Sequence, residues 1–144
     1  MDSIEANFIG FKKMEDEVLK REQEKNDSIS NLRMSFQNYV QKLQTQFDRM
    51  SLREKDSLNL LVSQMDADIR NKVGELNQNY QIYYVTKHTE IIGQVKNYCK
   101  EFNKNKKYSY IIANEPLFYY ADTAFDITSE LLKGLNAFYA KKNK

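Results

Sequence analysis

The stretch LNLLVSQMDADIRNKVGELNQNYQIYYVTKHTEIIGQVKNYCKEF, residues 58–102, decides the fold of this chain. Its apolar residues recur every eleven positions in three rows, the third of which is interrupted by Lys87. The rows are Leu58, Ile69, Tyr80, Ile91 and Phe102; Val62, Val73, Tyr84 and Val95; and Met65, Leu76 and Tyr98. An eleven-residue repeat corresponds to about 3.67 residues per turn, close to the value of a straight α-helix. The stretch therefore predicts one long helix with little supercoil.

The residues before this stretch predict a second long helix. Their apolar side chains follow steps of three and four, as in the seam of a coiled coil. The seam residues are Phe8, Phe11, Val18, Ile29, Leu32, Phe36, Tyr39, Leu43 and Met50. Because no proline interrupts the segment, we expect one continuous helix capped near Ser3. A polar gap at Glu15, Glu22 and Lys25 predicts the weakest packing along the seam.

The two helices are joined by a predicted turn near residues 50–52. Ser51-Leu52-Arg53-Glu54 has the form of a capping box, in which the serine and glutamate side chains bond reciprocally to backbone N–H groups. The result is a long antiparallel helical hairpin over residues 4–104. Gly10 and Gly93 would lie at one level of this hairpin, where two small residues permit close approach or bending. They are our candidates for a hinge.

A small β part is predicted after the hairpin. Residues 108–113 are rich in β-formers and read as a strand, 114–116 as a turn, and 117–120 as a second strand. Asp126 or Thr128 would cap a last helix that contains Leu131, Leu132, Leu135, Phe138 and Tyr139. The predicted fold class is thus mainly α with a small β part.

The composition narrows the class of protein. The 144 residues are 41% hydrophobic and 29% charged with 4 Gly and 1 Pro, which favours long helices with charged faces. A narrow apolar stripe gives a thin core, for which oligomerisation is the usual remedy. The net charge of +2 does not by itself indicate nucleic-acid binding. No window holds about 18 consecutive apolar residues, as a membrane span needs.

Few residues suit catalysis. His88 is the one histidine and lies within a helical segment, where we expect a surface or seam position. Cys99 is the one cysteine; Lys100 beside it would lower its pKa, but no partner base is evident, so we expect a structural thiol. The four glycines are scattered, so no phosphate-binding loop exists. We expect no enzyme activity, no cofactor and no metal.

The segment Tyr108–Leu135 carries a resemblance to a known family. It reads as strand, turn and strand, followed by Asp126-Ile127-Thr128 at the start of a helix that ends in Leu135-Asn136. The pattern resembles the Skp/OmpH family of periplasmic chaperones for outer-membrane proteins, whose members carry a similar aspartate-isoleucine-threonine motif after two short strands. Asp2-Ser3 is similar to the end of the family's first strand, which would precede Asp2. With the long hairpin, the resemblance covers the whole chain.

This resemblance implies a homotrimer shaped like a jellyfish. Strands from the subunits would form a small β-barrel body from residues 1–3 and 105–144, including the C-terminal helix. Residues 4–104 of each chain would form a tentacle, and the tentacles would surround a cavity. The implied function is that of an ATP-independent holdase, which binds unfolded outer-membrane proteins there and prevents their aggregation. The implied location is the periplasm, although the chain shown does not open with a signal peptide.

Aromatic residues are the candidates for contact with such clients. The segment from Tyr80 to Val85 contains Ile82, Tyr83 and Tyr84 and is too broad for one narrow seam, so some side chains should face away from the partner helix. Together with Met34, Phe36, Tyr39 and Met65, they would offer apolar area without strict geometry. The alternative is that they pack against the first helix or a neighbouring chain.

Two basic clusters of lysines lie toward the C-terminal end of the chain. The clusters are expected to be a solvated helix end and a soluble tail; attraction to anionic lipid or lipopolysaccharide is the alternative. They contain Lys104, Lys106, Lys107, Lys141, Lys142 and Lys144.

The main rival to a holdase is a structural coiled-coil adaptor that recognises a folded partner. A nucleic-acid binder is the second rival and predicts a strong loss of affinity with salt.

Overall fold

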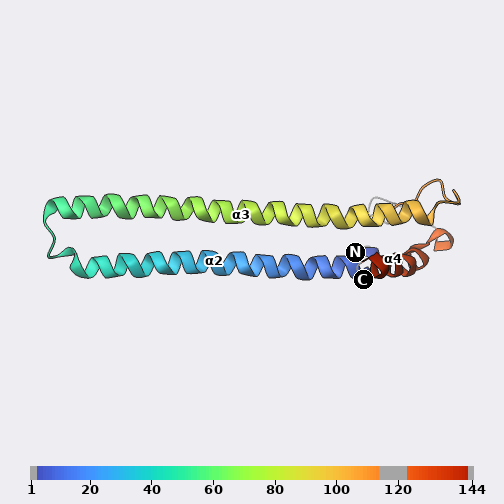
Figure 1. Cartoon of the computed structure of the whole chain (residues 1–144), viewed down its shortest axis with the longest axis horizontal. Helices are drawn as coiled ribbons and strands as arrows, with labels where there is room; N and C mark the ends of the chain where they lie inside the picture. The colour runs from blue at the N-terminus through green and yellow to red at the C-terminus, as the bar shows by residue number, and fades with distance from the viewer. Residues whose placement is uncertain (1–2, 114–122, 143–144) are drawn as a thin grey trace. The chain divides into compact units, whose positions relative to one another are not determined.

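The computed structural model describes residues 3–113 and 123–142, and the described elements are all helical. They are α1 (Ser3–Asn7), α2 (Ile9–Phe47), α3 (Leu52–Phe102), the short 3₁₀ helix η1 (Thr123–Phe125) and α4 (Thr128–Lys142) (Figure 1). The chain divides into two compact units. One comprises residues 19–83, and the other comprises residues 1–18 together with 84–144.

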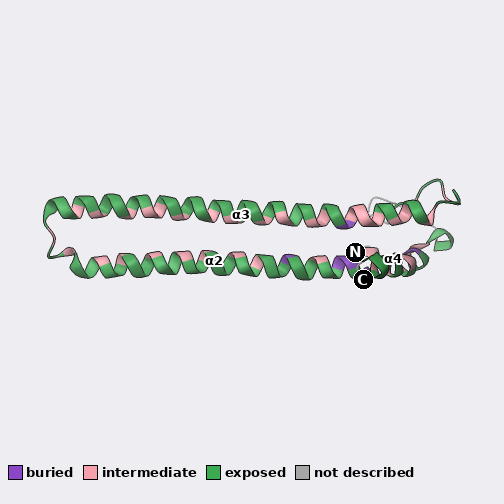
Figure 2. Ribbon diagram, viewed as in Figure 1, coloured by how far each residue is buried: buried purple, intermediate pink, exposed green. Residues whose placement is uncertain are grey.

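The unit of residues 19–83 is an antiparallel helical hairpin. Its two helical segments cover each other along one stripe, visible as half-buried positions in Figure 2. The covered apolar residues of α2 are Ile29, Leu32, Phe36, Val40, Leu43 and Phe47, and those of α3 are Leu58, Val62, Met65, Ile69, Val73, Leu76 and Tyr80. They follow the steps of three and four in α2 and the eleven-residue rows in α3, as predicted. All of them are only half-buried, so the hairpin has a thin core.

One seam position differs from the prediction. Tyr39 was predicted to lie in the seam, but its side chain is 37% exposed and Val40 takes the covered position. From Phe36 a step of three leads to Tyr39 and a step of four leads to Val40. The covered positions Leu32, Phe36, Val40, Leu43 and Phe47 thus follow the 3.6 residues per turn of a straight helix rather than a strict three-four alternation, so Val40 is covered and Tyr39 faces solvent.

The turn of the hairpin is closed by the predicted capping box. The Ser51 backbone N–H donates to Glu54 Oε2 at 2.8 Å, and the Glu54 backbone N–H points back to Ser51 Oγ at 3.4 Å. The Ser51 hydroxyl donates to the same carboxylate oxygen at 2.7 Å. These bonds satisfy N–H groups that the start of α3 leaves without a helical acceptor. The turn therefore needs no glycine.

The unit of residues 1–18 and 84–144 contains the best-buried core of the described chain. Phe8, Phe11, Ile91 and Leu135 form this core and are at most 4% exposed. Partly buried side chains surround it, namely Ile4, Met14, Ile92, Val95, Tyr98, Leu132 and Tyr139. On α4 the covered residues Leu131, Leu135 and Tyr139 follow steps of four, so one face of this helix is apolar as predicted.

The first helix is interrupted, and the prediction of one continuous helix from Ser3 was wrong. Helix α1 ends at Asn7 and α2 begins at Ile9, although no proline is present. The interruption coincides with a side chain from α4: the Ile9 backbone N–H donates to Asn136 Oδ1 at 2.9 Å. Asn136 Nδ2 donates to the Asn7 carbonyl at 3.4 Å. A polar side chain inserted into the helical ladder is a known cause of kinks, and a distant residue supplies it here.

The strand predicted over residues 108–113 is not present as a strand. These residues are irregular or in a bend, and the described residues contain no strand at all. A β-strand requires a neighbour for its backbone hydrogen bonds, because an isolated extended segment has no ladder. The second predicted strand, residues 117–120, lies outside the described residues, as does the turn before it.

A hydrogen bond at the start of α4 shows which residue caps this helix. Asp126 Oδ1 accepts from the Thr128 backbone N–H at 2.8 Å, so of the two predicted candidates Asp126 is the capping residue. Hydrogen bonds from the Thr128 side chain and backbone lower the pKa of Asp126 below its usual value. A negative charge at the first turn of a helix is also favoured by the helix dipole.

We expect the change Gly134→Ala to loosen α4 from α3. An added Cβ at Gly134 would overlap the Tyr98 hydroxyl, so the tyrosine or the helix must shift. Overpacking of this kind costs about 1–3 kcal/mol. Gly74→Ala is the matched control, because nothing lies within 4 Å of its added Cβ and helix propensity alone predicts a gain of about 0.5–1 kcal/mol. Urea unfolding followed by circular dichroism measures both; a stabilised Gly134→Ala protein would contradict the packing described here.

Candidate functional site

The predicted client-contact residues fall into two groups. Phe36, Met65, Tyr80 and Tyr83 are half-buried, which agrees with packing inside the hairpin. Met34, Tyr39, Ile82 and Tyr84 are exposed by 53%, 37%, 57% and 42%. The structure therefore does not gather the eight residues into one patch. It leaves the second group available as separate apolar contacts on two helices.

Cations cover the rings of the half-buried tyrosines. Lys25 Nζ lies 4.5 Å from the ring centre of Tyr80, and the Arg21 guanidinium lies 5.9 Å from that of Tyr83. The predicted polar gap in α2 is thus matched by aromatic rings of α3, and cation–π contacts replace part of the missing apolar packing. These two tyrosines stabilise the hairpin and are the weakest candidates of the set for client contact.

Several exposed apolar residues were missed by the sequence-based list. They are Leu19, Leu52, Leu60 and Leu61, with exposed fractions from 42% to 81%. The eleven-residue rows contain a signal for one of them: Leu58 and Val62 occupy the covered face, and Leu60, two residues from each, points away from it. Together with Met34, Tyr39 and Ile82, the four leucines are single exposed apolar side chains of a kind common on protein surfaces, spread over both long helices.

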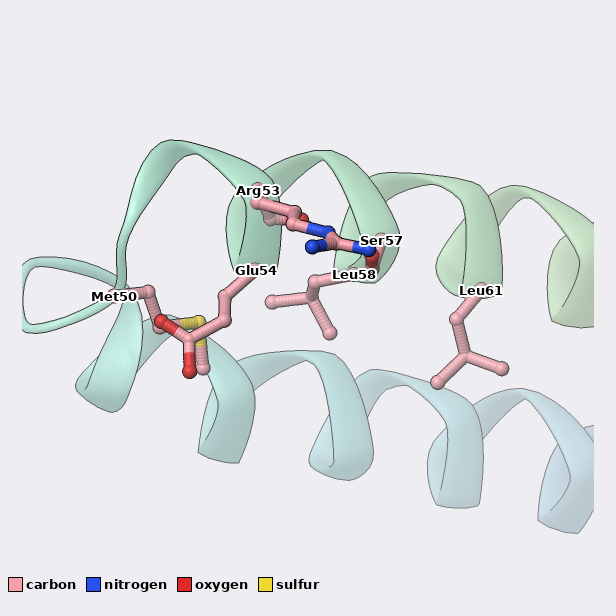
Figure 3. Close-up of a pocket in the computed structure, with 6 residues that line it drawn as sticks. All are labelled: Met50, Arg53, Glu54, Ser57, Leu58 and Leu61. Atoms are coloured by element: carbon pink, nitrogen blue, oxygen red, sulfur yellow. The ribbon is translucent and has the colours of Figure 1, made fainter.

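An open apolar depression lies at the turn of the hairpin. Met50, Leu58 and Leu61 form its apolar lining, and Arg53, Glu54 and Ser57 complete it (Figure 3). Beside it, Lys55 Nζ lies 4.8 Å from the ring centre of Phe47. Leu52, the first residue of α3, is 81% exposed. The tip therefore presents apolar side chains together with an arginine.

The capping box at this tip predicts a dependence of stability on pH. Hydrogen bonds from Ser51 lower the pKa of Glu54 below 4.5. Because the folded-state pKa is lowered, the stabilisation is complete above pH 4.5 and is lost as the pH falls through the folded value. We expect Glu54→Gln to lower the melting temperature at neutral pH and to have little effect in acid. Thermal unfolding from pH 7 to 2 checks this; a difference that stayed constant with pH would contradict the role of the charge.

A second exposed apolar group lies in the unit of residues 1–18 and 84–144. Tyr110, Ile112 and Phe125 are exposed by 82%, 65% and 82%. The loop before them is well fixed: Asn103 Nδ2 donates to the Tyr108 carbonyl at 2.7 Å, and the Tyr108 N–H donates to Asn103 Oδ1 at 2.9 Å. The Phe102 and Tyr108 rings stack with centres 6.1 Å apart. Of the three exposed side chains, Tyr110 and Ile112 thus follow directly on a loop held by these hydrogen bonds.

The hinge candidates Gly10 and Gly93 have different surroundings. A Cβ added to Gly10 would lie 2.6 Å from Ile91 Cδ1 and as close to the Phe8 ring, so this glycine is needed for close packing. At Gly93 the same atom would meet nothing within 4 Å. The tight contact on Gly10 is therefore made by Ile91 and Phe8. Whether the two glycines form a pivot stays a prediction.

The other singled-out residues have packing roles. His88 is half-buried, and its ring centre lies 6.1 Å from that of Tyr84 and 6.3 Å from that of Phe11. The expectation that Lys100 lowers the pKa of Cys99 was wrong, because burial of the thiol raises that pKa instead.

The lysines of the two basic clusters are exposed where the structure describes them. These are Lys104, Lys106, Lys107, Lys141 and Lys142, and Lys144 lies outside the described residues.

The described ranges, 3–113 and 123–142, lack two features. No group of three or more His, Cys, Asp or Glu residues in them is placed to hold a metal ion. None of their helices combines the length and the apolar character that a membrane crossing requires. The observations define a mainly helical protein whose exposed faces offer many separate apolar contacts.

The family follows from comparison with known sequences. A family model described as "Outer membrane protein (OmpH-like)" matches residues 1–135, so the chain belongs to the OmpH-like family. A comparison with curated proteins gives no match. Family membership confirms the resemblance drawn from the sequence, and it indicates a chaperone role toward outer-membrane proteins in general.

Proposed function

We propose that the protein is an ATP-independent holdase that binds unfolded outer-membrane proteins and prevents their aggregation. The observation that carries this proposal is the match to the OmpH-like family over residues 1–135. The exposed apolar residues of both long helices support it, because an unfolded chain is held best by many weak contacts of loose geometry. Met34, Tyr39, Ile82 and Tyr84 are the proposed contacts, and charged neighbours keep the complex in solution.

The proposed active form is a homotrimer. Tyr110 and Ile112 expose large apolar side chains within residues 108–113, which have no strand partner among the described residues. Both features favour pairing with other subunits, since an unpaired β-forming segment is stabilised by a neighbouring edge. In this arrangement residues 4–104 serve as the arm, and residues 1–3 and 105–144 contribute to a β-barrel body with α4 beside it. The arms then surround the client.

Binding and release need no nucleotide in this proposal. Each apolar contact is weak, so the client leaves when a membrane or an assembly machinery offers better burial. We place the protein in the periplasm, where unfolded outer-membrane proteins must be kept from aggregating. The exposed lysines of residues 104–107 and 141–142 would attract anionic lipid or lipopolysaccharide at the destination. No cofactor and no catalysis are required.

A binding experiment tests the proposal. A fluorescently labelled outer-membrane β-barrel protein is diluted from urea into the protein, and anisotropy is followed without nucleotide at low and high salt. We expect saturable binding of the unfolded client with a moderate dependence on salt, because apolar contacts dominate. The same client, folded in detergent beforehand, should not bind.

The rival functions predict different outcomes. Binding of the folded but not the unfolded partner would contradict the holdase proposal and favour a coiled-coil adaptor. Tight binding of an unrelated DNA or RNA oligonucleotide, with affinity falling steeply as salt rises, would favour a nucleic-acid binder.

A further inference from the structure

The interruption between α1 and α2 is held by a residue far away in sequence. In a continuous helix the Ile9 N–H would bond to the carbonyl four residues earlier, that of Glu5. Here it bonds to Asn136 Oδ1 at 2.9 Å, and Asn136 Nδ2 reaches the Asn7 carbonyl at 3.4 Å. The ladder is regular on both sides, since Phe8 N–H bonds to the Ile4 carbonyl and Lys12 N–H to the Phe8 carbonyl. The break is therefore confined to the point where Asn136 enters.

The local sequence does not require this break. Residues 3–12 contain no proline, although Asn7 and Gly10 are weak helix formers. These weak preferences permit a break at Asn7 but do not require one. The interruption must be stabilised by tertiary contacts that a continuous helix would lack.

Phe8 supplies the second such contact. Its side chain is 0% exposed and packs edge-on against the rings of Phe11 and Tyr139, with ring centres 5.9 and 5.3 Å away. The Phe8 ring also covers Gly10, at a distance that would not admit a Cβ there. Asn136 and Tyr139 both come from α4, so one helix provides the polar and the aromatic contact that fix the interrupted form.

We propose that α4 is a latch for the start of the long helix. While Asn136 is bound between Asn7 and Ile9, the helix is interrupted at Phe8; when Asn136 is withdrawn, residues 3–47 close into one continuous helix. The two forms exchange the Asn136 bonds for the Ile9-to-Glu5 backbone bond, so each satisfies the Ile9 N–H. The device is a two-state element of the kind from which conformational switches are built. It gives Asn136 a role independent of any client.

The change Asn136→Ala in the full-length protein tests the latch. Losing two side-chain hydrogen bonds should shift the ratio of interrupted to continuous helix by about tenfold or more. NMR would show the Cα chemical shift of Phe8, the one residue between α1 and α2, moving to a helical value. Asn136→Asp keeps the acceptor for the Ile9 N–H, so it should retain the interruption at neutral pH. Lys133→Ala, on the exposed side of α4, is the matched control and should leave the Phe8 shift unchanged.

The same spectra report whether α4 stays attached, because loss of the Asn136 side chain also weakens the attachment of this helix. Helical Phe8 shifts in Asn136→Ala, with α4 attached or released, support the latch. Unchanged, non-helical Phe8 shifts would overturn it, whether α4 stays attached or not, because the interruption would then be a property of residues 3–12 alone. Helical Phe8 shifts in the Lys133→Ala control would overturn it as well.

Discussion

The change Phe8→Ala should lower the free energy of unfolding of the unit formed by residues 1–18 and 84–144 by about 3–5 kcal/mol. Phe8 is fully buried at the centre of the core with Phe11, Ile91 and Leu135, and it contacts Tyr139 of α4. Truncation removes the transfer free energy of the ring and leaves a cavity beside Gly10, which has no side chain to fill it. The loss is a large fraction of the stability of a small unit.

Hydrogen exchange at α4 amides measures this loss separately from the hairpin. The amides of Leu131 and Leu135 lie on the buried face and should exchange much faster in Phe8→Ala. Phe125→Ala is the matched control, because the same side chain is removed from a position that is 82% exposed. If Phe8→Ala changed exchange no more than Phe125→Ala, the core described above would be wrong.

The second large effect concerns client binding. Changing Met34, Tyr39 and Ile82 together to glutamine removes three exposed apolar side chains from the hairpin of residues 19–83 while keeping good helix formers. Each side chain contributes on the order of 1 kcal/mol when its apolar surface is covered. Because many other contacts remain, we expect affinity for an unfolded client to fall by about a hundredfold rather than to vanish.

Anisotropy titration with a labelled unfolded client measures this affinity. The control changes three exposed polar neighbours, Gln37, Gln41 and Gln81, to alanine, which alters the same helices without removing apolar area. Circular dichroism of both variants should match the original protein. Equal affinity of the two triple variants would show that these side chains do not contact clients.

Periodic features of this fold could be predicted from sequence. The eleven-residue rows of Leu58 and Val62 gave the covered face of α3, and Ser51 with Glu54 gave the turn. Both are local patterns, so the residues that decide them are neighbours in the chain. The apolar face of α4 followed for the same reason.

Features that depend on contacts between residues distant in the sequence could not be predicted. The break at Phe8 depends on Asn136, which no local pattern near Phe8 reveals. The strand at residues 108–113 would need a partner, and sequence preference alone does not supply one. At the site, sequence identified apolar side chains but could not separate Tyr80, covered by Lys25, from exposed Ile82. That distinction depends on the register between the two helices.

Suppression of aggregation tests the central claim most directly. An unfolded outer-membrane β-barrel protein is diluted from denaturant with and without this protein, in the absence of nucleotide, and light scattering follows both turbidity and particle mass. The account predicts that the client stays in solution at about one trimer per client, in a complex of corresponding mass. Precipitation of the client at the same rate, with the protein remaining monomeric or dimeric, would contradict it.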